Sequence, residues 1–319
     1  PPQEHIWGFW RIPGLDAAAE LAHQEWATWR IVTEETSAEL ASLSHPYHAL
    51  YRSRWEAHCR ARAKEAGVQF VNQHPTKVDS SVQILDSRPS PIPRGQLMQH
   101  FIGWEVAAET GAFNPKIATL MDFRCDQSRG IHFIYVLPFS DSEALIESTM
   151  FSSQREPDNF FETAIATYLR EHCSQLDYSV MRVENGAIPM GRLQRSTGPD
   201  IGLGGNGGAI KPSSGYAFAF IQKQISTAVA STKKRANGMK IRPPHKIIDL
   251  WMDEVFVTVM RDWPAAAPDI FMRMARSLNG DEFALFVSGE TTWTLRLKVI
   301  FAMPKWIFIK SLVRNFFGK

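Results

Sequence analysis

Residues 97–124 read LMQHFIGWEVAAETGAFNPKIATLMDFR and place charged side chains among segments with the apolar composition of buried strands. Two carboxylates, Glu105 and Asp122, each stand beside an aromatic residue, and Arg124 follows two positions after the second. Carboxylates are rarely buried without a partner or a chemical task. The stretch therefore predicts strands that carry a site for handling protons or positive charge in an apolar cavity.

The segments around this stretch predict a mixed α/β protein. Four apolar segments bounded by turn-forming residues read as strands of an antiparallel sheet, at residues 100–108, 116–125, 130–140 and 143–152. Helical patterns are present at 51–67, 158–173, 216–232 and, in several pieces, from 245 to the end. We expect residues 15–30 to be helical or irregular and residues 68–72 to form a short strand.

Length, charge and cysteine content limit the class of protein. The 319 residues exceed one average core, which predicts one large or two interleaved domains. The 35 Lys and Arg against 33 Asp and Glu leave a net charge of +2, which argues against a general affinity for nucleic acid. The 3 cysteines fit neither a zinc motif nor a disulfide framework, and the 10 histidines form no ligand pair. We therefore expect reduced thiols in the cytoplasm and no metal.

The two ends of the chain bear on its relation to membranes. The N-terminal sequence lacks the pattern of a signal peptide, and no apolar segment reaches the roughly 20 residues that span a bilayer. Residues 304–319, PKWIFIKSLVRNFFGK, combine apolar side chains at helical spacing with Lys and Arg. Such a helix either lies in a membrane interface or packs against the protein body. We expect a protein that is soluble or lies on a membrane surface.

Acidic residues on the predicted strands are candidates for proton chemistry. A buried Glu105 would have a raised pKa and suit a general acid, whereas on the polar face of its strand it would be an ordinary surface residue. Asp122 and Arg124 share one face of a strand, as either a functional pair or an ordinary ion pair at a sheet edge. Glu147 and Glu184 are further isolated acids on strands. Spacing alone does not show whether these acids converge.

A glycine cluster at 202–215, GLGGNGGAIKPSSG, interrupts the pattern of strands and helices. Gly202, Gly204 and Gly207 satisfy GxGxxG, but a proline-bearing loop follows where a dinucleotide fingerprint requires a helix. Glycines followed by a lysine and a helix can still bind phosphate or let a flat ligand approach closely. The alternative is a flexible surface loop.

Six segments in one order carry a family pattern. They are QHFIGWEV (99–106), FNPKIATLMDFR (113–124), FIYVLPFS (133–140), ALIESTMFS (144–152), ENGAIPM (184–190) and GGNGGAIKPSSGYAFAF (204–220). In this order they resemble the flavin-dependent lycopene cyclases of carotenoid biosynthesis, bacterial type. The resemblance runs from about residue 86 onward and is weaker before it.

The resemblance implies an α/β (α+β) fold of the flavoprotein-monooxygenase type with an antiparallel-sheet substrate domain. The implied segments are a partial FAD-binding domain (1–95), the substrate domain (96–190), a return segment of the FAD-binding domain (191–240) and a helical C-terminal region (241–319). Members of the family begin with a strand and a glycine fingerprint, which this sequence does not show. We expect either a fragment or a much reduced affinity for FAD.

The resemblance also implies a reaction, the closure of the linear end groups of lycopene to β-ionone rings with FAD and NAD(P)H but no net redox change. Protonation of a terminal alkene forms a carbocation, an internal double bond attacks it, and loss of a proton completes the ring. This chemistry requires a neutral carboxylic acid in a dry pocket.

The resemblance assigns roles to residues of this sequence. The implied catalytic residues are Glu105, Asp122 and Arg124, and the implied substrate contacts are Trp104, Phe123 and Glu147. The implied cofactor contacts are Asp86, Gly204, Gly205, Gly207, Gly208, Lys211, Pro212, Ser213, Gly215 and Tyr216.

The expected partners are lycopene or a related polyene and the inner face of a membrane, to which the cytoplasmic protein would bind peripherally. A lycopene β-cyclase-like enzyme is the interpretation we favour. Two alternatives remain open, a flavin-dependent monooxygenase or oxidoreductase acting on another apolar substrate, and an inactive carotenoid-binding fragment.

Overall fold

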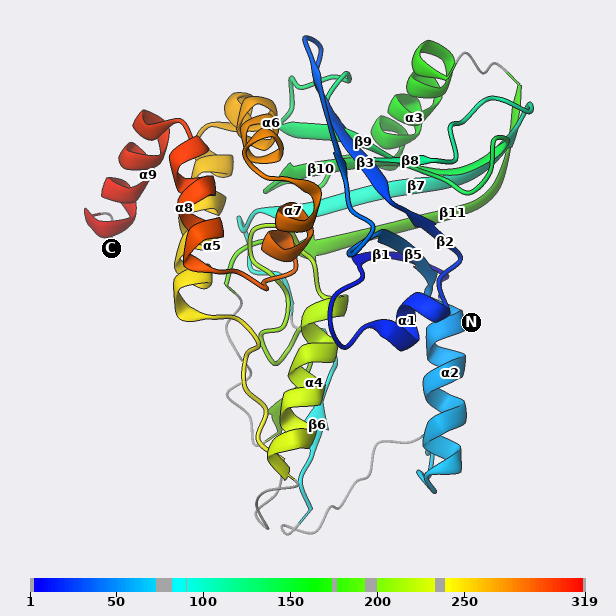
Figure 1. Cartoon of the computed structure of the whole chain (residues 1–319), viewed down its shortest axis with the longest axis vertical. Helices are drawn as coiled ribbons and strands as arrows, with labels where there is room; N and C mark the ends of the chain where they lie inside the picture. Colours follow the sequence, from blue (N-terminus) through cyan, green and yellow to red (C-terminus); the bar gives the residue numbers. More distant parts are fainter. Residues whose placement is uncertain are drawn as a thin grey trace.

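The computed structural model describes residues 3–72, 82–89, 91–173, 177–192, 200–232 and 239–317. Its largest element is a sheet of seven strands in the order β11-β7-β10-β9-β8-β3-β4 (Figure 1). The strands are β3 (Thr28–Val32), β4 (Ser37–Ala41), β7 (Met98–Ala108), β8 (Ile117–Asp122), β9 (Ile131–Pro138), β10 (Glu143–Ser152) and β11 (Tyr178–Pro189). The four strands predicted from the sequence are β7 to β10, and they pair antiparallel as expected.

Side chains along the central strands alternate between two faces of this sheet, as the period of two requires. On β10, Ile146 and Met150 pack in the core beneath helix α3 (Asp158–His172). Glu147 and Phe151 point to the opposite face, where a cavity lies. One face of the sheet is therefore covered by α3, and the other, which carries Glu147, faces the cavity.

Strands β3 and β4 extend the sheet from a part of the chain where the expectation was wrong. Within 15–30 only Asp16–Glu20 (α1) is helical, and β2 (Gln24–Trp26) and β3 follow it. Trp29 and Ile31 are buried and alternate with the half-buried Thr28 and Arg30, which is the pattern of a strand. Strand β3 pairs in parallel with β8, so the segment 1–95 supplies two strands to the sheet of the segment 96–190.

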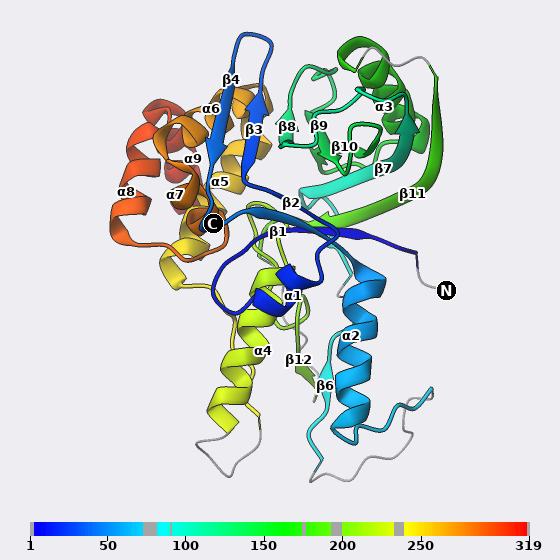
Figure 2. The ribbon, with the colours of Figure 1, turned by 45° about the vertical axis from the view of Figure 1, so that its right-hand side comes forward.

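A smaller sheet, in the order β1-β5-β2, lies below the large one (Figure 2). Its remaining strands are β1 (Ile6–Trp10) and β5 (Tyr47–Tyr51), which pair antiparallel. Trp10 and Tyr47 are buried with ring centroids 4.5 Å apart and belong to the main core. The Tyr47 hydroxyl oxygen also lies 2.6 Å from that of Tyr135 on β9, and this contact joins the small sheet to the cavity side of the large one.

The C-terminal part is helical, as predicted, and lies beside the cavity face of the large sheet (Figures 1 and 2). Its elements are α5 (Ile247–Asp262), the 3-10 turn η1 (Pro264–Ala266), α6 (Ala267–Ser277), α7 (Gly280–Val287), α8 (Trp293–Ala302) and α9 (Lys305–Phe317). Over the described residues, every helix is too short or too polar to cross a membrane.

The lower part of the molecule in Figure 2 holds α2 (Arg52–Glu65), α4 (Phe218–Thr232) and two short parallel strands, β6 (Leu85–Asp86) and β12 (Ile201–Gly202). Both helices were predicted. The strand expected at 68–72 does not form: these residues are exposed, and no described strand pairs with them. A β-strand needs a neighbour for its backbone hydrogen bonds, which an apolar sequence alone does not supply.

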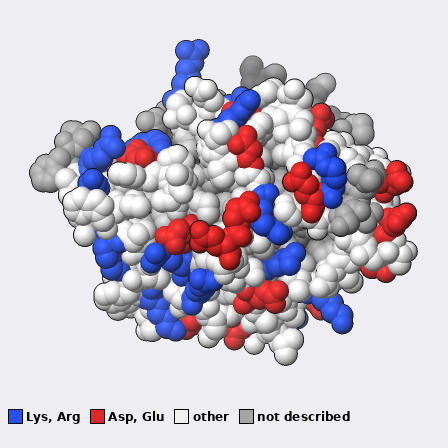
Figure 3. Space-filling view, turned by 90° about the horizontal axis from the view of Figure 1, so that it is seen from above, with Lys and Arg blue, Asp and Glu red and all other residues white. Residues whose placement is uncertain are grey.

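The charges of the described surface are mixed in sign on the face seen from above. Figure 3 shows blue Lys and Arg side chains interspersed with red Asp and Glu side chains across this face. The pattern agrees with the small net charge of +2.

Candidate active site

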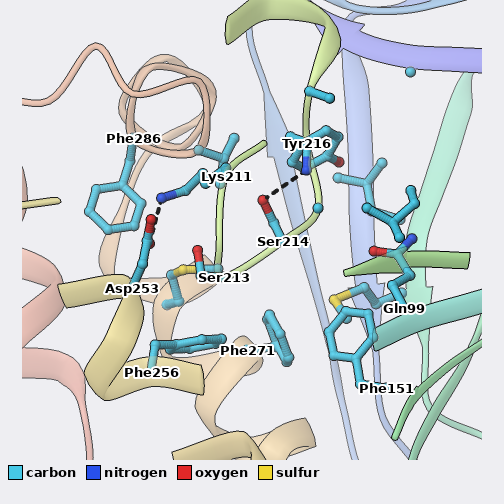
Figure 4. Close-up of a pocket in the computed structure, with 18 of the residues that line it drawn as sticks. Gln99, Phe151, Lys211, Ser213, Ser214, Tyr216, Asp253, Phe256, Phe271 and Phe286 are labelled. Carbon is cyan, nitrogen blue, oxygen red and sulfur yellow. Dashed lines mark hydrogen bonds and ion pairs between the residues drawn. The ribbon is translucent and has the colours of Figure 1, made fainter. Parts of the chain in front are cut away.

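A cavity of about 750 Å³ lies between the large sheet and the C-terminal helices. Strands β7, β9, β10 and β11 form one wall, helices α5 to α9 form another, and the loop before α4 closes a third side. Figure 4 shows Phe256 and Phe271 from the helices opposite Gln99 and Phe151 from the sheet. Most lining side chains are apolar, so the few polar groups among them act in mostly apolar surroundings.

Glu147 is the acidic side chain that the large sheet presents to this cavity. It is 9% exposed, and its Oε1 accepts a hydrogen bond of 2.6 Å from the Thr149 hydroxyl. Burial, followed by the charge of Glu184, raises the pKa of Glu147 to about 8. Near neutral pH this carboxyl group therefore holds its proton, which is the state that a general acid needs.

Glu184 lies close by, on β11. Its Oε2 accepts hydrogen bonds from the backbone N–H of Ile6 and from Nη1 of Arg182, both at 3.0 Å. Burial raises the pKa of Glu184 to about 7, although Arg182 opposes the rise. Gly103 stands opposite both Glu147 and Glu184 in the strand register, so the two carboxyl groups flank a position that has no side chain.

Three tyrosines surround the cavity side of Glu147. The hydroxyl groups of Tyr47 and Tyr135 are 2.6 Å apart, and Tyr216 makes a side-chain hydrogen bond with Tyr47. Burial raises the pKa of all three phenols well above the ordinary value, so they stay neutral. A Cβ atom on Gly8 would lie 1.9 Å from the Tyr47 hydroxyl oxygen, so a glycine is required there for this cluster to form.

Glu105 is the acid that the sequence analysis favoured as the proton donor. It lies on the same face of β7 as Gly103 but does not line the cavity. Nη2 of Arg182 is 2.8 Å from its Oε2, and the Tyr51 hydroxyl donates to its Oε1 at 2.9 Å. Both carboxylate oxygens therefore have donors. This ion pair links β7 to β11 at the edge of the site.

Asp122 and Arg124 form the ion pair that their spacing predicted, on the side of the sheet covered by α3. Arg124 donates to Asp122 at 2.9 and 2.6 Å, and the Tyr168 hydroxyl of α3 donates at 2.8 Å. Burial alone would raise the pKa of Asp122, but these hydrogen bonds outweigh it and hold the pKa below its ordinary value. The pair joins the end of β8 to α3 and does not line the cavity.

The two aromatic residues expected to contact substrate lie behind the cavity walls. Trp104 packs on the α3 side, with its ring centroid 6.2 Å from that of Tyr178. Phe123 stacks on Phe271 at 5.9 Å and contacts Phe133 edge-on at 5.8 Å. Phe271 and Phe133 line the cavity, so Phe123 supports its wall from behind.

The residues expected to contact the cofactor divide into two groups. Lys211, Ser213, Gly215 and Tyr216 line the cavity, and the Lys211 Nζ forms a 2.6 Å ion pair with Asp253 of α5 (Figure 4). The remaining ones lie outside the lining: Asp86, Gly204, Gly205, Gly207, Gly208 and Pro212.

The GxGxxG glycines serve the folding of their own loop. A Cβ on Gly202 would lie 2.5 Å from the Asn206 carbonyl oxygen, and one on Gly207 would lie 2.6 Å from the Gly202 oxygen. Gln224 of α4 accepts from the Gly204 N–H at 2.8 Å and donates to the Gly207 oxygen at 3.0 Å. The loop is therefore a compact turn fixed to α4. Asp86 pairs with Arg88 beside it, and its backbone oxygen accepts from Asn206.

The sequence named Glu147 and Tyr216 as site residues and left the convergence of the strand acids open, but it did not predict the tyrosine cluster. Tyr47, Tyr135 and Tyr216 come from β5, β9 and the loop before α4, so no local pattern joins them. For Glu147 a signal existed, because the alternation along β10 places it on the same face as Leu145 and Phe151. A polar residue inside an apolar face that continues on both sides is the mark of a buried group.

Comparison with known proteins gives the family. A model described as lycopene cyclase protein matches residues 1–312. Among curated relatives, lycopene beta-cyclase of Pantoea ananas is 26% identical over 224 residues, covering 65% of this chain and 56% of the relative. Lycopene beta-cyclase of a Paracoccus species is 26% identical over 166 residues, covering 49% and 42%. The chain thus spans about half the length of the curated relatives that it matches.

Two solved structures show the fold. A geranylgeranyl bacteriochlorophyll reductase-like protein from Thermoplasma acidophilum has a TM-score of 0.54 at 12% identity, covering 92% of this chain and 84% of that one. An HpxO variant from Klebsiella pneumoniae, complexed with FAD, has a TM-score of 0.51 at 12% identity and covers 86% of each chain. The predicted fold class is confirmed, a mixed α/β fold of the flavoprotein type with a helical C-terminus.

Proposed function

Because this chain belongs to the lycopene cyclase protein family, we propose that it is a lycopene β-cyclase-like enzyme that closes the linear end groups of lycopene to β-ionone rings. The observation that carries this proposal is the buried position of Glu147 at the wall of an apolar cavity, where burial raises its pKa to about 8. Acid-initiated cyclisation needs a proton donor that is neutral at physiological pH and is kept from water.

In the proposed reaction, Glu147 donates its proton to the terminal alkene of an end group bound in the cavity. The Thr149 hydroxyl fixes one of its oxygens, so the carboxyl group keeps one orientation. The internal double bond then attacks the tertiary carbocation, and a proton leaves the new ring to restore a carbon–carbon double bond. One proton is added and one removed, which makes the reaction an isomerisation.

The cavity walls suit a carbocation. Phe133, Phe151 and the ring of Tyr135 line the cavity on the side of β9 and β10. Aromatic faces stabilise a cation by about 0.5–2 kcal/mol each when water is excluded. Because the tyrosine hydroxyls bond to one another, they are held in place, and their neutral rings remain electron-rich.

This proposal moves the acid from Glu105 to Glu147 and gives the other predicted residues supporting roles. Glu105, held between Arg182 and Tyr51, maintains the junction of β7 and β11. Asp122 and Arg124 fix α3 to the sheet. None of these three residues lines the cavity.

We propose that FAD binds on the side of the cavity formed by residues 211–217. Gly215 has φ of +70°, and a Cβ there would lie 3.0 Å from Ile188, so only glycine lets this backbone lie against the sheet. The loop leads directly into α4, whose first residue, Phe218, also lines the cavity. The positive end of that helix favours negative charge nearby. These features fit a flat ring with an electron-rich reduced state, which would stabilise a cation in the cavity, and NAD(P)H is the proposed reductant.

We also propose that the protein binds peripherally to a membrane through α8 and α9. Large apolar side chains are exposed on one side of each helix, with Phe301 at 71% and Trp306 at 67%. Ile300 and Ile309 of the same helices line the cavity. A polyene dissolved in the bilayer would therefore reach the site from the surface that contacts the lipid.

The test is pigment analysis of lycopene-accumulating bacteria that express this chain, with a parallel culture expressing it behind a flavin-binding βαβ unit. Conversion to cyclised carotenes is expected, and Glu147→Gln should abolish it. Glu143→Gln, on the same strand but exposed, is the matched control and should retain it. An active Glu147→Gln variant would refute the acid assignment. Hydroxylated pigment would indicate a monooxygenase instead, and bound but unchanged lycopene a carotenoid-binding protein.

A further inference from the structure

The three strands β10, β7 and β11 place Glu147, Gly103 and Glu184 in one row across the large sheet. Glu147 and Glu184 are each the register partner of Gly103, so all three side-chain positions share one face. Neighbouring strands lie about 4.8 Å apart, which separates the two glutamate backbones by roughly 10 Å. Two glutamate side chains can approach across that distance when the residue between them is small.

Gly103 provides the space for this approach. A Cβ atom there would lie 3.1 Å from Glu184 Cγ, 3.1 Å from Leu145 Cδ1 and 3.5 Å from Glu184 Oε1. Glu184 thus leans over the glycine, on the side toward β10. Because Gly103 lies in the middle of a strand, steric room and not a left-handed turn accounts for glycine here.

The two carboxyl groups differ in what holds them. Glu184 accepts from two N–H donors, Ile6 and the cationic Arg182, which favour its ionised form. Glu147 accepts only the neutral hydroxyl of Thr149 among the hydrogen bonds found for it. Of two buried acids in one site, the better-solvated one ionises first, and its charge keeps the proton on the other.

We infer that Glu184 is a positioning residue that keeps the catalytic proton on Glu147 and draws a proton back to it after each turnover. This inference rests on the proposed function. Donation by Glu147 leaves two carboxylates across Gly103, an unfavourable like-charge pair. The proton released when the ring C–H bond breaks returns to this pair, so that protons balance over the cycle.

The other groups around Glu147 do not supply this charge. Tyr47, Tyr135 and Tyr216 are neutral phenols. On the loop and α5, Lys211 and Asp253 form an ion pair. On the Glu184 side, Arg182 binds both Glu184 and Glu105, and His5 of the N-terminal segment lines the cavity with a pKa lowered by burial. Glu184 is the carboxylate in register with the acid.

The test is a pH titration of the protonated carboxyl band in infrared difference spectra of the full chain, assigned to Glu147 by its loss in Glu147→Gln. Glu184→Gln should lower the midpoint, which we expect at about 8 in the parent chain, by about one pH unit or more. Cyclisation measured at pH 8 should then fall about fivefold, because the protonated fraction falls from about one half to about one tenth. Glu105→Gln, which also removes a carboxylate bound to Arg182, is the control and should leave the midpoint near that of the parent.

A second variant guards against misfolding of Glu184→Gln. Gly103→Ala keeps every charge but pushes Glu184 away, and it should lower the midpoint in the same direction. An unchanged midpoint in a folded Glu184→Gln or Gly103→Ala chain would overturn the inference, whatever the activity. If the parent chain does not cyclise lycopene but the midpoint shift is present, the proposed function is refuted. The coupling between the carboxyl groups of Glu147 and Glu184 is then still supported.

Discussion

At the scale of single residues, the surroundings of a carboxyl group decide what it can do. Glu105, Asp122 and Glu147 all stand on strands among apolar residues. Glu105 and Asp122 each accept hydrogen bonds from an arginine and a tyrosine, whereas Glu147 accepts from a threonine hydroxyl and faces phenols and a second acid. The surroundings of Glu147 favour a neutral acid near pH 7.

The raised pKa of Glu147 also predicts how the free energy of unfolding depends on pH. Its pKa is raised to about 8 in the folded protein, against 4.5 for an ordinary glutamate. The native state therefore binds a proton that the unfolded state has lost, and this contribution to stability declines as pH rises from about 4.5 to 8. Glu147→Gln should remove the decline, which reaches about 1.4 kcal/mol per pH unit for one proton.

The measurement is urea denaturation of the parent chain and Glu147→Gln from pH 5 to pH 8. The free energy of unfolding of the variant, relative to the parent, should rise with pH. Several buried or half-buried histidines titrate in both proteins, including His100 and His245, whose pKa values are lowered to about 4 by desolvation. The difference between the two curves therefore reports the titration of Glu147 together with its effect on the neighbouring Glu184. A constant difference would show that Glu147 is ionised throughout.

At the scale of elements, the strands that the sequence predicted are those whose information is local. Strands β7 to β10 are long, apolar and separated by turn-forming residues, and helix α3 follows them with an apolar stripe. Strands β3 and β4 are short, and their place beside β8 depends on a parallel pairing across about 90 positions of sequence. Short windows do not carry that pairing, so residues 15–30 were predicted wrongly.

The same distinction holds for the candidate site. Glu147 was predicted as a site residue, and the lining part of the glycine loop was predicted as a cofactor site, because each sits in a recognisable segment. The tyrosine cluster needs Gly8 of β1, Tyr47 of β5 and Tyr135 of β9 to meet. These residues meet only because the two sheets pack together, and their spacing along the sequence does not show it.

The attachment of α3 to the sheet gives a prediction at this scale. Asp122 is fully buried, and Arg124 and Tyr168 both donate to it. Asp122→Asn leaves a partly buried guanidinium without its counter-charge and should lower stability by about 1–3 kcal/mol. Tyr168→Phe should cost about 1.5 kcal/mol, because it removes one hydrogen bond to a charged group.

Thermal or urea denaturation checks these losses, and turnover per folded molecule is the companion measurement. Because neither residue lines the cavity, both variants should cyclise at the parent rate when folded. If Asp122→Asn lost turnover while its stability was unchanged, Asp122 would have the catalytic role that the family resemblance implied.

At the scale of the whole molecule, the cavity and the exposed apolar surface lie on the same side. In Figure 1 helices α8 and α9 form the left edge, and α2 and α4 extend downward away from them. Among the described side chains of α8 and α9, the exposed large apolar ones are Trp293, Leu297, Ile300, Phe301, Trp306, Ile309 and Val313. Exposed patches of this kind mark an interaction surface.

Cations accompany these side chains and make the lipid preference predictable. Lys305 lies 5.2 Å from the ring centroid of Phe301, and Lys310 lies 4.6 Å from that of Trp306. A surface that pairs aromatic rings with lysine binds anionic lipid through both buried apolar area and charge. The chain should therefore bind vesicles containing phosphatidylglycerol more tightly than vesicles of phosphatidylcholine alone.

Vesicle sedimentation tests this last prediction with two pairs of substitutions that change charge equally. Lys305→Gln with Lys310→Gln should weaken binding to anionic vesicles about 30-fold, since each cation near the surface contributes about 1 kcal/mol, or about fivefold in affinity. Arg62→Gln with Lys64→Gln makes the same charge change on α2 and should leave binding unaltered. Equal losses in the two pairs would mean that binding follows net charge alone, and the α8–α9 surface would then not be the docking face. Phe301→Ala with Trp306→Ala should weaken binding to both kinds of vesicle, because it removes apolar contact that does not depend on lipid charge.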